Sequence, residues 1–215
     1  MGDISDIKDD QYTTIRGISR AELRVKKSRF IGLATSVAAE QDAIGFVHSI
    51  QAEFPGATHY CYAFSIGTDA KKLIRSSDAG EPANSAGKPI LSAVEASGFQ
   101  NVVCVVVRYF GGIKLGIGGL IRAYGQTARD CLRDAEKIVY VPSVHLEIEM
   151  PYAHIGAVVN LVSRLKGKIL NMDHGEKTKT VVHIRCTMVP PLEENIRAIS
   201  GDISVKKAIR SEGLL

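Results

Sequence analysis

The segment VVCVVVRYFGGIKLGIGGLIR, residues 102–122, decides the fold expected for this chain. It opens with six apolar residues, Val102 to Val107, five of them β-branched, a pattern typical of a central strand that is buried on both faces. Five glycines follow within the nine residues Gly111 to Gly119. From about Gly118 onward, apolar residues recur at helical spacing: Leu120, Tyr124, Ala128, Cys131 and Ala135. The segment therefore predicts a buried strand, a glycine-rich turn and a long helix.

The residues before this unit predict an alternation of strands and helices. The helix at 39–54 is indicated by Ala43, Val47, Ile50 and Phe54, and Pro55 with Gly56 ends it. A second helix at 86–96 follows Asn84 and Ser85, either of which we expect to cap it. The strands are predicted at 12–18, 23–25, 30–37, 59–66 and 73–75, the last two joined by a turn at 67–69.

The residues after the unit predict a second, smaller domain. Apolar periodicity indicates strands at 144–150, 181–188 and 203–209, helices at 155–165 and 192–199, and one further strand before a turn at 173–176. This βαββαβ order is the ferredoxin-like arrangement. With a boundary near Glu136, we predict an α+β protein of two domains, residues 1–136 and 137–215.

Composition excludes several classes of protein. Of the 215 residues, 45% are hydrophobic and 23% charged, as in a globular protein and unlike a disordered one. The longest apolar run has six residues, too few to cross a bilayer, and the first residues, MGDISD, lack both a secretory apolar region and the Ser or Thr of a myristoylation motif. The four cysteines are dispersed, which argues against a disulfide framework or a zinc site. We therefore expect a cytoplasmic protein without a metal or cofactor.

Charge is distributed unevenly along the chain. The net charge is +4, of which residues 137–215 carry +3 from 11 basic and 8 acidic residues. No Asp or Glu occurs from Ala96 to Arg129, although Arg108, Lys114 and Arg122 lie within that stretch. Whatever surface this stretch exposes is expected to be positive.

The glycine segment is the strongest candidate site. Glycines before a helix let a ligand approach closely and leave N–H groups at the positive end of the helix dipole. The candidate anion-binding residues are Arg108, Tyr109, Gly111, Gly112, Lys114, Gly116, Gly118, Gly119 and Arg122. A phosphate-bearing partner would fit them; alternatively, the glycines only permit a tight crossover. The P-loop and dinucleotide fingerprints are both absent, because Leu120 and Ile121 occupy positions that those motifs reserve for other residues.

Two further groups are weaker candidates. Asp78 and Glu81 could act as acid and base or hold a magnesium ion, but the interpretation we favour is that Lys88 and Arg108 pair with them. On that interpretation Ser77, Asp78, Glu81 and Lys88 order a loop beside the glycine turn. His59 and Cys61 share one face of their strand, which admits a nucleophile pair or two metal ligands, but no further ligand set converges with them.

Five blocks of sequence resemble those of the YigZ/Impact family. The blocks are KSRF at 27–30, HYCYA at 59–63, SDAGEP at 77–82, AGKPIL at 86–91 and VVRYFGGIKLGIGGLIRAYG at 106–125. The last of them is the most specific. The resemblance covers roughly residues 25 to 135. The chain departs from the commonest motif at Ala79, where many members carry Asp, and at Asn84 and Ser85, where many carry Gly-Thr. These departures weigh against catalysis that requires two adjacent aspartates.

The resemblance implies a first domain similar to domain four of elongation factor G and to a domain of a small-subunit ribosomal protein. It implies a second domain similar to that factor's ferredoxin-like domain five. Eukaryotic Impact proteins restrain the amino-acid-starvation kinase by competing for its ribosome-associated activator. The bacterial members have no settled biochemical activity.

The leading hypothesis is therefore a non-enzymatic binding protein that contacts RNA, the ribosome or a translation factor. Arg108, Lys114 and Arg122 would contact phosphate, and Tyr109 would either stack on a base or lie in the core, where Phe110 is expected. One alternative is an enzyme that acts on a small phosphorylated substrate or nucleotide through the glycine loop. Another is a protein–protein regulator that binds no nucleic acid. The sequence indicates no oligomeric state.

Overall fold

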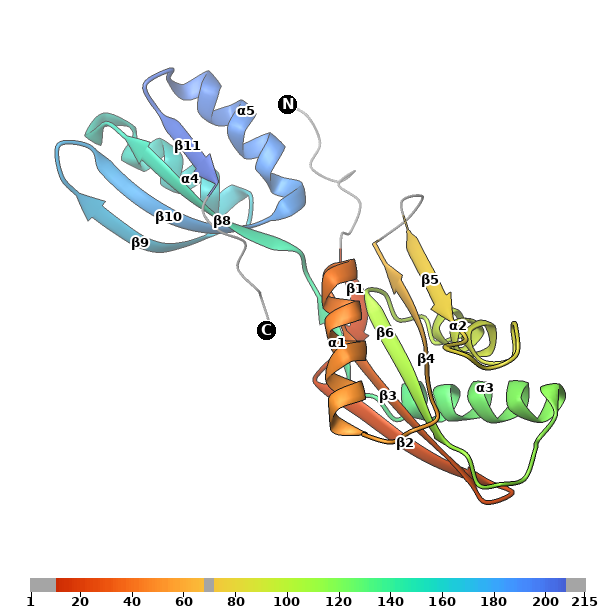
Figure 1. The fold of residues 1–215 in the computed structure, drawn as a ribbon. Coiled ribbons are helices and arrows are strands. Elements are labelled where there is room, and N and C mark those ends of the chain that lie inside the picture. The colour runs from red at the N-terminus through yellow and green to blue at the C-terminus, as the bar shows by residue number, and fades with distance from the viewer. Residues whose placement is uncertain (1–10, 68–71, 208–215) are drawn as a thin grey trace. The chain divides into compact units, whose positions relative to one another are not determined.

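The computed structural model describes residues 11–67 and 72–207, which fall into two compact units (Figure 1). One unit comprises Tyr12–Val139 and the other begins at Tyr140. The division into domains at residues 136 and 137 stays a prediction. The N-terminal residues discussed above, most of the 67–69 turn and the end of the last predicted strand lie outside the described residues.

The first unit is built on a five-stranded antiparallel sheet in the order β2-β3-β6-β4-β5. Its central strand, β6, pairs with β3 on one side and β4 on the other. The six apolar residues that open β6 are all fully buried, so the prediction of a central strand covered on both faces is confirmed. The strands are β2 (Ile18–Val25), β3 (Ser28–Ser36), β4 (His59–Ile66), β5 (Leu73–Ser77) and β6 (Val102–Tyr109).

Helices cover both faces of this sheet, as can be followed in Figure 1. Alternate residues of β6 point to opposite faces: Val103, Val105 and Val107 pack with α1, whereas Val102, Cys104 and Val106 pack with α2 and α3. The helices are α1 (Glu40–Glu53), α2 (Gly87–Ala96) and α3 (Ile117–Arg133). The two faces explain why β6 lacks the polar alternation of a half-exposed strand.

The start of the chain is divided differently from the prediction. The strand expected at 12–18 ends at Ile15 as β1 (Tyr12–Ile15), because Gly17 has a positive φ of 65° and turns the chain into β2. β1 pairs with β7 (Lys137–Tyr140) in a separate two-stranded sheet. β2 and β3 form a hairpin whose two turn residues, Lys26 and Lys27, both have positive φ, as in the tight turns that match strand twist.

The second unit is a four-stranded antiparallel sheet with two helices and the order β11-β8-β10-β9. Its elements are β8 (Ser143–Met150), α4 (Ile155–Arg164), β9 (Lys168–His174), β10 (Thr178–Arg185), α5 (Val189–Ile199) and β11 (Ser204–Lys207). The predicted βαββαβ order is confirmed. The strand predicted at 181–188 is displaced, because Thr178 and Thr180 are buried within it and Cys186–Met188 form a 3₁₀ turn that leads into α5.

Among the described residues, no helix combines the length and apolar character needed to cross a membrane.

Gly111 is predicted to be essential for stability. A Cβ there would overlap the backbone carbonyl of Lys27, which belongs to the hairpin turn packed against the glycine segment. Overpacking against backbone cannot be relieved by a rotamer change, so Gly111→Ala should cost about 2 kcal/mol or more of unfolding free energy.

The matched control is Gly45→Ala in α1, where a Cβ meets nothing within 4 Å. That change should raise stability by about 0.5–1 kcal/mol because alanine favours the helix. Urea unfolding of both variants provides the measurement, and equal stability of the two would contradict the tight contact at Gly111.

Candidate functional site

A cleft of about 430 Å³ lies where the glycine segment leads into α3. It brings together the start of β4, the loop that carries Asp78 and Glu81 (the acidic loop), the end of β6 and the first turn of α3. The lining residues are Thr58, His59, Glu81, Pro82, Arg108, Phe110, Lys114, Leu115, Gly116, Ile117 and Leu120. Members of all three sequence candidates (the glycine segment, the acidic loop and the His59–Cys61 pair) therefore line one cavity.

A buried ion pair forms part of the cleft wall. Arg108 Nη1 donates to Glu81 Oε1 at 2.6 Å, and the two side chains are only 6% and 3% exposed. The Tyr124 hydroxyl donates to the same oxygen at 2.7 Å. The Arg108 guanidinium lies 5.3 Å from the ring centroid of Phe110 and 5.5 Å from that of Phe30. This is the pairing of the acidic loop with Arg108 that the sequence favoured.

Asp78 orders the acidic loop from within. Its carboxylate accepts N–H hydrogen bonds from Asn84 at 2.8 Å, Ala86 at 2.9 Å and Gly87 at 2.8 Å. Partial burial pushes the Asp78 pKa upward, but these three donors and the positive charge of Lys88 outweigh burial, so the pKa lies below its ordinary value. Asp78 thus caps the start of α2, and the expectation that Asn84 or Ser85 supplies the cap is wrong.

Ser77 supports the same loop, because its Oγ accepts the N–H of Ala79 at 3.2 Å. The carboxylates of Asp78 and Glu81 are thus both engaged in contacts within the chain. The described residues contain no group of three or more His, Cys, Asp or Glu side chains placed to hold a metal ion.

His59 and Cys61 both reach from β4 to the backbone of the acidic loop. The Cys61 thiol donates to the Asp78 carbonyl at 3.0 Å, and burial raises its pKa to about 12. The thiol therefore stays protonated and is a poor nucleophile. His59 Nδ1 lies 2.9 Å from the Ala79 carbonyl, which can only accept, so Nδ1 carries a proton and Nε2 faces Glu81 at 3.9 Å.

The glycine segment leaves backbone donors open at the start of α3. Gly112 and Gly116 have φ values of 84° and 72°, a conformation that favours glycine. Gly116 is the N-cap and has no side chain, and the first intrahelical bond runs from the N–H of Leu120 to the Gly116 carbonyl. The N–H groups of the first three residues of α3 therefore have no acceptor within the helix.

The remaining candidates differ in exposure. Lys114 and Arg122 are exposed, and Tyr109 is half-buried with its hydroxyl 3.4 Å from the Pro55 carbonyl. Phe110 is 45% exposed, so its expected place in the core is wrong. The reason is that β6 ends at Tyr109, and Phe110 lies beyond the sheet at the cleft.

Arg108 lies in a different setting from the other cationic candidates. It is buried and paired, yet its Nε has no hydrogen-bond partner among the described residues. Direct contact of Arg108 with an anion stays a prediction, as do the contacts assigned to Lys114, Arg122 and Tyr109.

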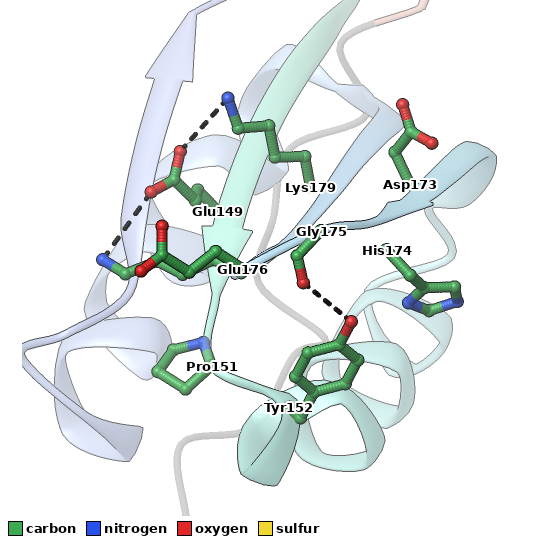
Figure 2. A pocket seen from close by; sticks show the side chains of 9 residues that line it. Glu149, Pro151, Tyr152, Asp173, His174, Gly175, Glu176 and Lys179 are labelled. Carbon is green, nitrogen blue, oxygen red and sulfur yellow. Dashed lines mark hydrogen bonds and ion pairs between the residues drawn. The ribbon is translucent and has the colours of Figure 1, made fainter.

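A larger cavity, of about 910 Å³, lies in the second unit (Figure 2). Its polar groups contact one another: Lys177 and Lys179 each lie 3.6 Å from a Glu149 oxygen, and the Tyr152 hydroxyl donates to the Gly175 carbonyl at 2.8 Å. The Tyr152 ring stacks on His174. Sequence reasoning missed this cavity because no motif marks it. Because both of its lysines pair with Glu149, it is a weaker candidate for binding an anion than the cleft.

Comparison with known proteins identifies relatives along most of the chain. A family model described as the Impact N-terminal domain matches residues 26–132. YigZ, an IMPACT family member of Escherichia coli (strain K12), is 38% identical over 151 residues, which are 70% of this chain and 74% of YigZ. An IMPACT family member of Haemophilus influenzae is 34% identical over 190 residues, 88% of this chain and 89% of the relative. The crystal structure of a hypothetical protein aligns with 94% of this chain and 99% of its own, with 31% identity and a TM-score of 0.66.

Asp78→Asn should destabilise the first unit by about 1–3 kcal/mol, because an amide cannot accept all three N–H groups with both of its terminal atoms. Since the folded-state pKa of Asp78 is depressed, its contribution is present above the unfolded pKa of about 3.9 and is lost as the pH falls through the folded value. Urea unfolding at pH 7 and at about pH 3 checks both statements.

Glu95→Gln, which removes an exposed carboxylate from α2, is the matched control and should change little. Asp78→Asn should also lose stability less steeply than the wild type as the pH falls. An identical pH dependence in the two proteins would contradict the role assigned to Asp78.

Thiol chemistry tests the placement of the cysteines. Cys61, Cys104 and Cys131 are buried and Cys186 is exposed. Under native conditions at about pH 8, a thiol-reactive disulfide should therefore label one cysteine rapidly, and all four only after unfolding. Rapid native labelling of Cys61, located by mass spectrometry, would revive the nucleophile hypothesis.

Proposed function

The chain belongs to the IMPACT family, and on that premise we propose that it is a non-enzymatic binding protein that contacts RNA through the cleft at the start of α3 and so modulates translation. The RNA partner, the non-enzymatic character and the translational role all go beyond family membership. The resemblance of the first unit to domain four of elongation factor G is part of the same proposal.

The observation that carries the proposal is the set of unopposed donors around the cleft. Lys114 and Arg122 are exposed, and the open N–H groups of α3 lie between them in the sequence. Among the described residues, Glu81 is the only carboxylate that lines the cleft, and it is buried and paired with Arg108. The exposed side of the cleft is therefore positive, which suits the phosphates of a nucleic-acid backbone.

Catalysis is less well supported by the same geometry. The carboxylates of Asp78 and Glu81 are occupied by structural hydrogen bonds, and the Cys61 thiol is held protonated. His59 also lines the cleft, but its Nδ1 is bound to the Ala79 carbonyl and its Nε2 lies 3.9 Å from Glu81, and one imidazole does not define a reaction.

A protein partner is the second candidate, and one observation favours it. Ile113, Ile117 and Ile121 are each more than 40% exposed on the glycine segment and the first turns of α3. Ile117 and Ile121 are four residues apart and so share a helix face. Apolar side chains beside basic ones would suit a ribosomal protein or a translation factor as well as RNA.

Fluorescence anisotropy with labelled single-stranded RNA tests the proposal. Binding should weaken from about 50 to 200 mM salt, as it does when phosphate contacts release counterions. Lys114→Ala/Arg122→Ala should reduce the affinity for RNA about tenfold. The slope of log affinity against log salt concentration should become shallower by roughly one to two, because two phosphate contacts are lost.

Lys72→Ala/Arg75→Ala removes the same charge at the far end of the sheet. Leu73 pairs with Ile66 and Arg75 with Phe64, so both changes lie five or more residues, roughly 16 Å, along β4 from His59. This control should bind RNA like the wild type. Equal losses in the two double variants would mean non-specific attraction, and no binding by the wild type would refute the RNA contact and leave the protein partner.

A further inference from the structure

The cleft has the size of a small-molecule site. Its volume of about 430 Å³ falls near the lower end of the range of about 300–1,000 Å³ for ligand pockets. A helix or strand of a partner protein needs a long groove instead. A single flat, charged unit of a larger molecule is the kind of group that fits.

One part of the lining is built for an anion. The first turn of α3 offers open N–H groups, and Lys114 stands beside them. Independently, Arg108 lines the cleft with a side chain that is only 6% exposed and with an Nε that lacks a partner in the described chain. The Nε atom is itself buried, so the anion contacts available from the cleft are those of Lys114 and the helix start.

Another part of the lining is apolar. Leu115, Ile117, Leu120 and Pro82 contribute aliphatic surface, and the ring of Phe110 is 45% exposed beside them. An exposed aromatic ring next to an aliphatic wall is the arrangement on which proteins stack nucleobases. The pairing of Glu81 with Arg108 keeps the wall close to neutral, so the carboxylate does not repel a phosphate as a free one would.

We infer that the cleft receives one nucleotide of the bound RNA, with its phosphate at the first turn of α3 beside Lys114 and its base against Phe110 and the aliphatic wall. This inference rests on the proposed function and adds a defined ligand: a nucleoside monophosphate unit. The base is recognised as an apolar ring, so the site accepts single-stranded RNA of varied sequence.

The test is the binding of adenosine 5′-monophosphate to the full chain. Isothermal titration calorimetry measures the affinity, and shifts of backbone amide resonances locate the site. The nucleotide should shift the amides of residues 114–120 and displace labelled RNA. Adenosine and inorganic phosphate alone should each bind about tenfold more weakly, because each lacks one half of the contacts.

Gly118→Asp separates binding from folding. A Cβ at Gly118 meets nothing within 4 Å, and an acidic residue in the first turn of a helix is favourable, so the unfolding midpoint should stay the same or rise. The new carboxylate should lower affinity for the nucleotide at least about tenfold by repelling the phosphate. Gly118→Asn is the neutral control and should lose much less, while Phe110→Ala should weaken adenosine and the nucleotide alike.

The outcomes separate this inference from the proposed function. RNA binding that requires Lys114 and Arg122, but that the nucleotide does not displace, would overturn the nucleotide site and leave the RNA contact standing. Nucleotide binding at residues 114–120 without any RNA binding would overturn the proposed function, and the assignment of the site to RNA with it. If Gly118→Asp and Gly118→Asn bind the nucleotide with equal affinity, its phosphate does not lie at the start of α3.

Discussion

The ion pair between Glu81 and Arg108 is the interaction on which the rest of the site depends. Removing two charges from water costs several kcal/mol for each ion, and only short, well-supplied hydrogen bonds repay it. Here the pair is 2.6 Å long, Tyr124 adds a second donor to the same carboxylate oxygen, and Phe30 and Phe110 lie against the guanidinium. Because Glu81 belongs to the acidic loop, Arg108 to β6 and Tyr124 to α3, the pair ties three separate parts of the first unit together.

The ion pair holds the acidic loop, which forms one wall of the cleft, whereas the start of α3 forms another wall and keeps its backbone donors. The acidic loop is held from the sheet by Cys61 and His59 and from inside by Asp78, which satisfies the backbone at the start of α2. Nothing equivalent caps α3, whose N-cap is Gly116. Of these two helix starts, that of α2 is closed by a carboxylate, whereas that of α3 has no side-chain cap. Since both are N-terminal ends with the same dipole, only the second can accept an external anion.

The elements of this fold are predictable from sequence where their patterns are strong and local. The strand β6 is predicted from its continuous apolar run, because it is buried on both faces. The strands of the second unit are predicted from alternating apolar residues, because they are buried on one face. The errors arise where a single side chain or the exact end of a strand decides. The cap of α2 comes from Asp78, eight residues before Ala86, and the exposure of Phe110 depends on the residue at which β6 leaves the sheet. The second cavity depends on residues of four elements, β8, the 3₁₀ turn at Tyr152–His154, β9 and β10, that share no motif.

The same distinction changes how the acid-free stretch from Ala96 to Arg129 is interpreted. Counted along the sequence, Arg108 belongs to a run of unopposed positive charge, but its partner, Glu81, lies 27 residues away. The pair removes one cation from the exposed surface and leaves Lys114, Arg122 and Arg129, together with the backbone donors of α3. A site with so few charges holds a single phosphate weakly. A polymer that offers several phosphates to neighbouring donors gains from effective concentration, which a free mononucleotide cannot. On the proposed function, such a surface would therefore suit a strand better than a small metabolite.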